Sequence, residues 1–576
     1  MLKVLGAVAA AALLCAGAAV AGEAVDIPAI IGEPSAAKPD DLPNPPDIYS
    51  RNGVLEATLT AKPSRITVAG RSFTSNVYNG LYIPPTLRLN PGDTLKLSLV
   101  DQIGRADIEI RRKQPTNVHY HGTDVTPKPP GDDVLTDAQP GETRHYVVPF
   151  PEDHPRGLHW YHPHAHGYVE KQILSGMSGM LIVEGDLKRH YPEFVDLRER
   201  VLVLKDIYLP GQDQNTAKIK TINSYLDPRI RARPNEWQVW RLGNLGADAF
   251  FHLALDGHDF WTIERDGNVL PKPERQASVF LSPGARATVL VSAGKAPGRF
   301  KLRSLKIDTG PQGDPNPEVV VGTLDVSGEP VEEKGVAARL EEPAAHRKSI
   351  SPRAVDLKNA PIARERTFDF SESANGNRFF INGKQFDENV VDTTVRLGDV
   401  EKWTIRNLSG ELHVFHLHQT AFLVLDKSEG VQEDSPGMRD VINLPYAQDA
   451  KPGVVTLIIP FTNPVMLGRF VYHCHVVGHE DAGMMQIIRV LPPKTAAEQL
   501  WYGLNRLAGL NTPPPWWPER ARRAALLPEA DELSAALRGE ICVTPSDDEE
   551  ADEPTVAASL ALSGKGPIPP AAAPRE

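Results

Sequence analysis

Cysteine is scarce in this chain: only Cys15, Cys474 and Cys542 occur among 576 residues. Small secreted folds that depend on disulfides carry many more cysteines, so a disulfide scaffold is excluded. The chain is also long enough for three or four domains with cores of their own. A thiol left in an oxidising compartment calls for an explanation, and metal ligation is one.

An excess of basic residues is absent as well. There are 62 lysines and arginines against 74 aspartates and glutamates, which gives a formal net charge of −12. A protein that neutralises many phosphates needs the opposite balance, so we expect no nucleic-acid partner.

Long apolar runs are missing beyond the N-terminus. Residues 4–20 form the one such run, after the basic start Met1-Leu-Lys3, and Ala19-Val20-Ala21 fits cleavage by a signal peptidase. Residues 1–21 are therefore expected to be a signal peptide, which predicts an exported protein, periplasmic or secreted. An uncleaved membrane anchor is the alternative. After cleavage we expect no stable membrane insertion.

What the chain has in abundance is turns, with 52 prolines and 45 glycines between short β-type segments such as Thr94–Leu99 and Ala287–Val291. This spacing is typical of β-sandwiches. Helical periodicity is sparse before residue 495. Beyond that residue, two stretches could be helical, and an acidic run and Pro/Ala-rich text follow that are typical of a disordered tail.

An internal repeat organises the β-rich part. Gly468-Arg-Phe-Val-Tyr-His-Cys-His475 aligns with Gly298-Arg-Phe-Lys-Leu-Arg-Ser-Leu305 and with Gly157-Leu-His-Trp-Tyr-His-Pro-His164. We therefore expect an extended leader at 22–55, sandwich domains at 56–190, 195–330 and 360–495, a linker at 331–359, and a partly helical or disordered extension at 496–576. The middle copy has Arg303, Ser304 and Leu305 where the third has two histidines and a cysteine, so it is expected to hold no metal.

Four His-x-His pairs stand out among the 18 histidines: His119/His121, His162/His164, His416/His418 and His473/His475. Residues two apart on a strand point to the same side, so each pair can present two imidazoles to one pocket. Eight imidazoles are too many for one ion, which predicts a metal cluster. Packed or surface histidines would be the ordinary explanation for one such pair, but not for four.

A second metal site is predicted in the third domain. His413, Cys474 and His479 supply two nitrogens and a thiolate, and Met484 suits a long axial position. This donor set selects copper over harder cations, with zinc as the alternative metal. Because Cys474 points away from His473 and His475 on an extended strand, the two sites are expected to lie a few covalent bonds apart.

Together these motifs resemble the three-domain, laccase-like multicopper oxidases. The resemblance covers about 60–495 and rests on His119-Tyr-His-Gly122, Trp160-Tyr-His-Pro-His164, His413-Val-Phe-His-Leu-His418 and His473-Cys-His-Val-Val-Gly-His-Glu-Asp-Ala-Gly-Met484. It implies an all-β fold of three cupredoxin-like Greek-key sandwiches, with the cluster between the first and third.

The same resemblance implies four copper ions per chain and a role for each ligand. His413, Cys474, His479 and Met484 would hold the type 1 copper, and His119 with His416 the type 2 copper. The type 3 pair would be held by the other six paired histidines, His121, His162, His164, His418, His473 and His475. Single electrons would enter from a reductant at type 1, and O₂ would be reduced to water at the cluster.

Reduction of O₂ to water consumes protons, so acids are expected beside the cluster. Glu480 matches a proton-relay position of relatives, and Asp132 or Asp133 is the second candidate. Two features depart from the family pattern or add to it. Gln419-Thr420 replaces a common Gly-His, and the additional His159 and His166 are expected to support ligands or lie at the surface.

The electron donor is less defined. The seven methionines form no methionine-rich run, which disfavours a cuprous substrate. A phenolic or aromatic reductant is favoured, and a metallo-oxidase or copper-resistance protein acting on ferrous or cuprous ions is the alternative. A scaffold that has lost copper and a copper nitrite reductase are further alternatives, which a count of bound copper would distinguish.

Overall fold

The computed structural model describes residues 39–492, apart from 104–113, 214, 333, 342–356 and 429–436, together with Ala497 and Leu500. The expected signal peptide, the first part of the leader, much of the linker, nearly all of the C-terminal extension, Cys15 and Cys542 lie outside the described residues. Within the described part, no helix is long and apolar enough to cross a membrane.

Two sheets form the first sandwich. One has the order β1 (Asp47–Tyr49), β4 (Thr86–Leu89), β9 (Gly179–Val183), β8 (Gly157–His162), β6 (His119–His121). The other has the order β3 (Arg71–Tyr78), β2 (Val54–Val68), β5 (Thr94–Asp101), β7 (Thr143–Pro149).

The second sandwich follows the same plan. Its first sheet has the order β11 (Ile219–Ile222), β10 (Arg198–Ile207), β13 (Trp237–Asn244), β18 (Arg286–Ser292), β15 (Phe260–Arg265), β16 (Asn268–Gln276). Its second sheet has the order β12 (Arg229–Ala232), β20 (Val319–Val326), β19 (Gly298–Ser304), β14 (Phe251–Leu255), β17 (Ser278–Leu281).

The third sandwich repeats it again. One sheet has the order β22 (Phe379–Ile381), β21 (Arg364–Glu372), β24 (Asp399–Asn407), β29 (Gly453–Phe461), β26 (Phe422–Lys427), β27 (Met438–Arg439). The other has the order β23 (Val391–Arg396), β31 (Met485–Leu491), β30 (Gly468–Cys474), β25 (His413–Leu417), β28 (Val441–Leu444).

Helices that lie wholly within the described residues are few and short. They are α1 (Val169–Ser175), α2 (Asp186–His190), α3 (Val336–Glu341) and α4 (Val477–Asp481), with 3₁₀ turns η1 (Pro192–Phe194), η3 (Leu357–Asn359) and η4 (Pro464–Met466).

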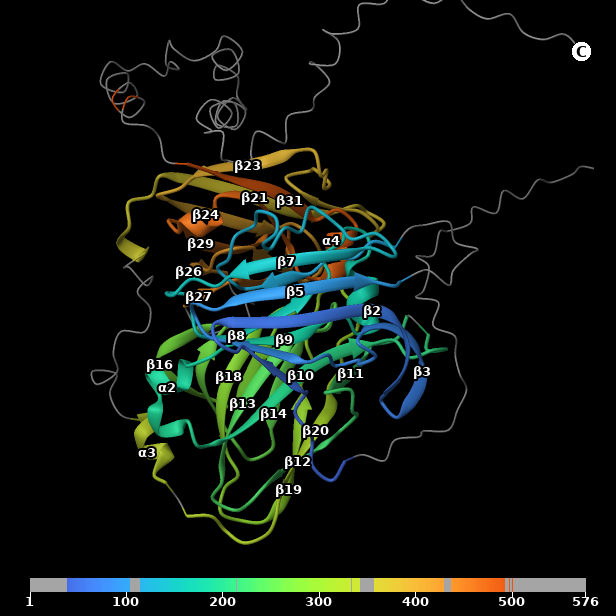
Figure 1. Ribbon diagram of the computed structural model, residues 1–576, viewed down its shortest axis with the longest axis vertical. Coiled ribbons are helices and arrows are strands. Elements are labelled where there is room, and N and C mark those ends of the chain that lie inside the picture. The colour runs from blue at the N-terminus through green and yellow to red at the C-terminus, as the bar shows by residue number, and fades with distance from the viewer. Residues whose placement is uncertain are drawn as a thin grey trace, which may run out of the picture.

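The three sandwiches share one topology, which confirms the all-β fold and explains the sequence repeat. In each, an early strand pairs in parallel with a later one: β2 with β5, β10 with β13, and β21 with β24. Parallel neighbours need a connection that crosses to the other sheet, as in Greek-key sandwiches. In Figure 1 the strands β2, β5 and β7 cross the centre of the molecule, between third-domain strands and middle-domain strands.

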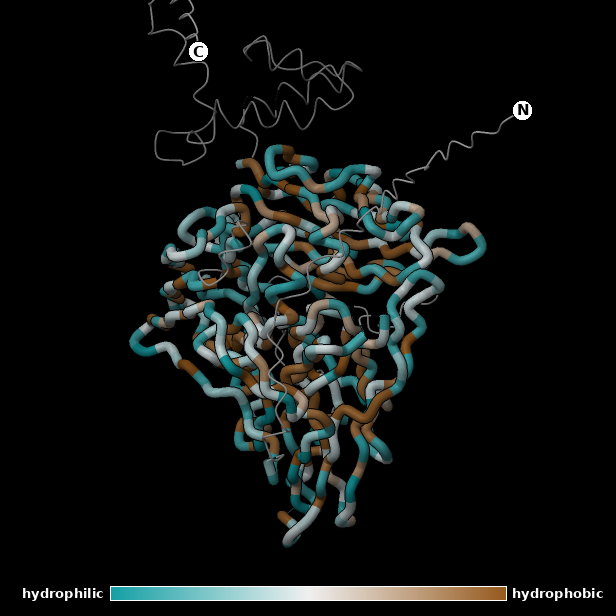
Figure 2. Tube along the Cα trace, turned by 90° about the vertical axis from the view of Figure 1, so that its right-hand side faces the viewer, coloured by the Kyte–Doolittle hydropathy of each residue, from teal (hydrophilic) through white to brown (hydrophobic). Residues whose placement is uncertain are grey.

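Buried and exposed residues alternate along strand β5 of the first sandwich. In β5, Leu95, Leu97 and Leu99 are buried while the residues between them are at least partly exposed. This period of two places one face of the strand on the core and the other in water. Figure 2 shows hydrophobic segments running mainly through the body and hydrophilic ones at many of the loops.

By contrast, strand β13 of the middle domain is buried at every position. The first and middle domains share one apolar cluster, in which Leu158 and Trp160 lie with Val201 and Val203. Both faces of this part of the middle sheet are therefore covered, so the two domains are packed against each other rather than merely linked.

The part of the expected leader that the structure describes contributes to the sandwiches. Strand β1 pairs in parallel with β4, and Leu42 is buried in the core cluster of the middle domain. The apolar Leu42 and Ile48 are isolated among prolines and polar residues, so their sequence gave no periodic signal. The first sandwich thus begins before residue 56.

Candidate metal centres

The register of neighbouring strands brings the four His-x-His pairs together. In the first domain His119 lies opposite His162 on the adjacent strands β6 and β8. In the third domain His416 lies opposite His473 on β25 and β30. Each domain therefore presents two pairs side by side on one sheet.

The two sheets meet with their histidines interleaved. The His119 ring stacks on His418, and the His121 ring stacks on His416, each at a centroid distance of 3.8 Å. All eight paired imidazoles are at most 1% exposed. The pairs thus form a single closed cluster whose members alternate between the first and third domains.

Oxygen atoms hold the outer nitrogens of several of these rings. Nδ1 lies 2.7 Å from the Asp440 carbonyl in His416, 2.9 Å from the Pro163 carbonyl in His162, and 2.9 Å from the Cys474 carbonyl in His473. A carbonyl oxygen only accepts, so Nδ1 carries the hydrogen and the Nε2 lone pair points inward.

The inward nitrogens are the strongest indication of a metal. Among the described residues, Nε2 is buried without a hydrogen-bond partner in five of the paired histidines: His119, His121, His162, His416 and His475. Such orphaned buried atoms are rare in native proteins unless an ion or a water molecule satisfies them. Ligand atoms also group within reach of one ion, as in His164, His418 and His473.

Burial keeps six of the eight paired imidazoles neutral. It lowers the pKa of His164 and of His475 to about 3, and the pKa of His121, His162, His416 and His418 well below the ordinary value. A metal ligand must be unprotonated, so the cluster is ready to bind cations at neutral pH.

The second predicted site also assembles. His413 Nδ1 lies 3.0 Å from His479 Nδ1, and the Cys474 sulfur lies 3.6 Å from the former and 3.8 Å from the latter. Two nitrogens and one sulfur thus form a small triangle. This set of donors suits copper better than hard cations.

Polar partners outside the triangle fix its imidazoles. His413 Nε2 bonds the Ser409 hydroxyl at 2.9 Å, and His479 Nε2 lies 3.4 Å from a Glu411 carboxylate oxygen. Burial raises the pKa of the Cys474 thiol, so the thiol loses its proton only to a cation that binds the sulfur. Met484 is fully buried, and its carbonyl accepts from the Cys474 amide at 3.0 Å.

Strand β30 joins the two sites. Its Cys474 belongs to the triangle, and His473, the residue before it, belongs to the cluster. His475, the residue after the strand, contacts the His121 ring edge-on at a centroid distance of 4.8 Å. The alternation of an extended strand separates these side chains onto opposite faces.

The predicted acids divide into two that reach the cluster and one that does not. Glu480 is fully buried, and its carboxylate lies 3.0 Å from His473 Nδ1 and 3.5 Å from His164 Nε2. Asp132 lies 2.9 Å from His119 Nδ1. Asp133 instead pairs with Arg144 at 2.9 Å and points away.

The residues that depart from the family pattern, or add to it, lie in different places relative to the cluster. Gln419 is buried with φ of 62°, and its amide donates to Asp132 at 2.7 Å, so it supports the first domain's carboxylate from the third domain. His159 is buried against His154 rather than in the cluster, and His166 is exposed and contacts Phe386.

No sequence pattern pointed to the residues that brace the cluster from the middle domain. Arg286 and Asp440 form a fully buried ion pair at 2.6 Å beside His121 and His416. The available signal was the Pro283-Gly284 turn of the repeat, which ends two residues before Arg286, but nothing in it pointed to the third domain.

Three sandwiches with a cysteine-containing site and an eight-histidine cluster between the outer two define a class of copper enzyme, and known proteins agree. Three family models, each described as multicopper oxidase, match residues 60–188, 159–328 and 359–494 and together cover more than half of the chain. The chain belongs to the multicopper oxidase family, whose members bind copper and reduce O₂ with electrons from a reductant.

The individual similarities are distant. The multicopper oxidase mco of Staphylococcus haemolyticus is 26% identical, covering 76% of this chain and 89% of that protein. A laccase of Bacillus stratosphericus is 23% identical, covering 72% and 90%. A solved multicopper oxidase of Campylobacter jejuni, described as a metallo-oxidase, is 24% identical with a TM-score of 0.64, covering 79% and 96%. The last of these shows the shared fold of cupredoxin-like sandwiches.

The neutral histidines predict how the copper-free protein responds to acid. Burial lowers the pKa of His154 to about 4 and that of His164, His475 and His479 to about 3, below the roughly 6.5 of an unfolded histidine. The unfolded chain then binds more protons, so this stabilisation is complete above about pH 6.5 and is lost as the pH falls towards 3. The thermal midpoint of metal-free protein should fall steadily below about pH 6.5. A midpoint that stays constant from pH 7 to 4.5 would contradict this.

Proposed function

We propose that the chain is a laccase-like oxidase with copper ligands divided as the family resemblance implies. His413, Cys474, His479 and Met484 would hold the type 1 copper, His119 and His416 the type 2 copper, and the other six paired histidines the type 3 pair. When bound, copper supplies one-electron oxidation of the reductant at the cysteine site and reduction of O₂ to water at the cluster.

The convergence of buried imidazole rings from two domains carries this proposal. The Nε2 atom of His473 lies 3.2 Å from that of His164 and 3.1 Å from that of His418. These three nitrogens fit one half of a type 3 pair. His121, His162 and His475 have ring centroids between 4.8 and 5.8 Å apart, which fits the other half.

Acidic side chains beside the cluster can supply the protons that the imidazoles cannot. Every water molecule formed needs two protons, and both Glu480 and Asp132 lie within hydrogen-bond reach of a cluster histidine. Glu480 can hold and release a proton at the His164 and His473 side, and Asp132 at the His119 side. We propose Glu480 as the principal proton relay, Asp132 as the second, and no such role for Asp133.

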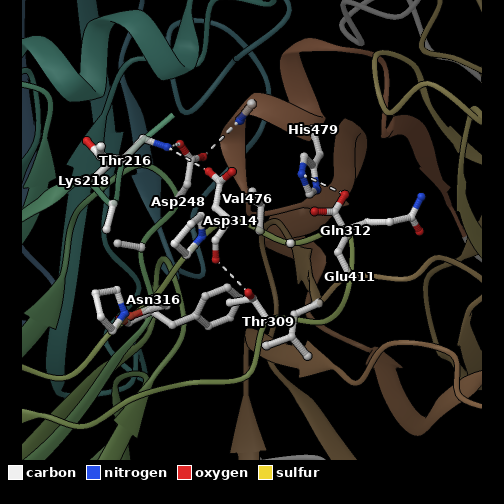
Figure 3. A pocket seen from close by; sticks show the side chains of 18 of the residues that line it. Thr216, Lys218, Asp248, Thr309, Gln312, Asp314, Asn316, Glu411, Val476 and His479 are labelled. Carbon is white, nitrogen blue, oxygen red and sulfur yellow. Dashed lines mark hydrogen bonds and ion pairs between the residues drawn. The ribbon is translucent and has the colours of Figure 1, made fainter. Parts of the chain in front are cut away.

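The reductant is proposed to bind in a pocket of about 980 Å³ between the middle and third domains. Figure 3 shows His479 and Glu411 on one side of the pocket and Lys218 and Asp248 on the other. This volume lies in the range of small-molecule sites. Phe379, which also lines the pocket, stacks on His479 at 4.0 Å and gives that end an aromatic surface. These features support a phenolic or other aromatic reductant.

A metal-ion reductant is the second candidate, because five carboxyl groups line the pocket: Asp227, Asp248, Asp314, Glu372 and Glu411. Burial, followed by the charge and hydrogen bond of Glu372, raises the pKa of Glu411 to about 9. A cation bound there would have to displace that proton. No methionine is among the described residues that line the pocket, which supports ferrous over cuprous ions.

We also propose that the protein is exported to a periplasmic or secreted location, because its N-terminal segment has the pattern of a signal peptide.

Replacement of Cys474 by serine tests the proposed site directly. A hydroxyl is a poor substitute for a thiolate, so the variant should lose the blue absorption and one of about four copper ions per chain. Oxygen consumption with any reductant should fall to background, while the other coppers remain. Copper analysis and an oxygen electrode give the answer. Undiminished transfer of electrons to O₂ in a loaded C474S protein would overturn the proposal.

Glu480→Gln isolates the proton step. The amide keeps the shape of the side chain but holds no transferable proton, so reoxidation of the reduced enzyme by O₂ should slow by roughly 100-fold or more. The blue absorption and the rate of reduction should be retained. Stopped-flow spectroscopy separates the two half-reactions, and Glu411→Gln serves as control because it alters a carboxyl at the other site. An unchanged reoxidation rate would remove Glu480 from the mechanism.

Glu411→Gln distinguishes the two classes of reductant. It removes a carboxyl that a cation would bind, so kcat/KM for ferrous ion should fall by at least about tenfold, while kcat/KM for a phenol should change by less than about threefold. Glu365→Gln, which removes an exposed carboxylate outside the pocket, should change neither. If the wild-type protein oxidises ferrous ion but no phenol, and E411Q loses that activity, the metallo-oxidase alternative would be favoured.

A further inference from the structure

One arginine of the middle domain contacts all three domains at the histidine cluster. Arg286 begins β18 and is 1% exposed. Its two terminal nitrogens donate to both carboxylate oxygens of Asp440 in the third domain, at 2.6 and 2.7 Å. Its Nε donates to the Leu158 carbonyl in the first domain at 3.1 Å. A single side chain therefore spans the junction where the copper ligands meet.

Each of these contacts leads to a proposed ligand. The carbonyl of Asp440 accepts the Nδ1 hydrogen of His416 at 2.7 Å, so the position of Asp440 sets the tautomer and direction of that ring. Leu158 lies on β8, the strand that carries His162. Arg286 Nη1 also lies 3.5 Å from His121 Nδ1.

The turn before Arg286 lies against His475, a member of the fourth His-x-His pair. Gly284 has φ of 84°, and its carbonyl accepts from Arg286 Nη1 at 3.1 Å. A Cβ atom on this glycine would lie 3.1 Å from the His475 ring and 3.2 Å from His121 Nε2. The middle domain, which has no ligand of its own, thus closes one side of the cluster.

Space around the guanidinium is fully used. Gly122 follows directly after His121 with φ of 76°, and a Cβ atom there would overlap Arg286 Nη2 and an oxygen of Asp440. The glycine in the first histidine motif is therefore required by the arginine as well as by the turn.

The charge arrangement explains why an arginine occupies this position. A buried guanidinium is costly unless carboxylates and hydrogen bonds satisfy it. Asp440 takes both terminal nitrogens, Asp266 lies 3.5 Å from Nη1 and accepts from the Arg286 amide, and Arg439 lies 3.6 Å from Asp266. The planar fork with five donors reaches two domains at once, and a lysine has no such geometry.

We propose that Arg286 is a positioning residue for the histidine cluster, holding His416 through Asp440 and fixing the spacing between first-domain and third-domain ligands. The proposal rests on the proposed assignment of these histidines as copper ligands. The middle domain would then control copper retention at a site to which it contributes no ligand.

The test compares Arg286→Lys and Asp440→Asn with Arg200→Lys in the copper-loaded protein. Arg200 is a matched control, since it is a 3% exposed arginine of the middle domain that binds both oxygens of Asp41, and it lies on β10. Partners that orient a ligand are typically worth 10–100-fold in metal affinity. R286K and D440N should therefore lose copper from the histidine cluster at about 10–100-fold lower chelator concentration than the wild type. The electron paramagnetic resonance spectrum of the proposed type 2 copper should also change.

In both variants the blue absorption of the cysteine site should be retained. R200K should keep the wild-type chelator titration and spectrum even where its metal-free form melts at a lower temperature. Wild-type chelator titrations and spectra in both R286K and D440N would overturn the proposal. If R286K does not fold, D440N is read alone, because it keeps the carbonyl that binds His416 and alters only the ion pair. Wild-type protein that fails to hold about four copper ions would contradict the proposed function instead.

Discussion

The arrangement of eight buried imidazoles between two domains is the constraint on which the rest of this structure depends. A metal ligand must be unprotonated and aimed at the ion; burial lowers the pKa of six of these rings, and carbonyl oxygens on Nδ1 orient His162, His416 and His473. The stacked pairs His119/His418 and His121/His416 each join two domains. The cluster therefore exists only when the first and third domains are docked, and the fold must hold them together.

The middle domain meets that requirement without any ligand of its own. Lys205 is fully buried, and its Nζ donates to the first-domain carbonyls of Tyr82, Gly176 and Ser178 between 2.8 and 3.2 Å. Burial lowers the pKa of this amino group, and a polar group is stable in the interior only if carbonyls replace its water, so the contact is specific to one docked arrangement. Arg286 acts on the other side, where it reaches the third domain. Loss of the histidines from the middle copy is thus compatible with an essential role for it.

The sequence was most informative where its signal was local. The period of two within a strand predicts that the members of each His-x-His pair share a face and that Cys474 opposes its neighbours, because only the backbone decides this. Contacts between distant positions left no such trace. Gln419 and Asp132 are 287 positions apart, and Arg286 and Asp440 are 154 apart. Sequence could not choose between Asp132 and Asp133 either, since the choice depends on Arg144 pairing with the latter.

The two proposed sites differ in access, and the difference matches what each would exchange. The cluster histidines are at most 1% exposed, whereas the side chain of His479 is 13% exposed and lines a pocket. In the proposed function an electron would cross a few bonds of β30 without any opening, so the reductant could stay outside while the cluster remains enclosed. Protons cannot travel this way and would need groups that hold them, and Glu480 lies against His164 and His473 on the closed side. Burying the cluster between two domains would therefore require separate routes for electrons and protons.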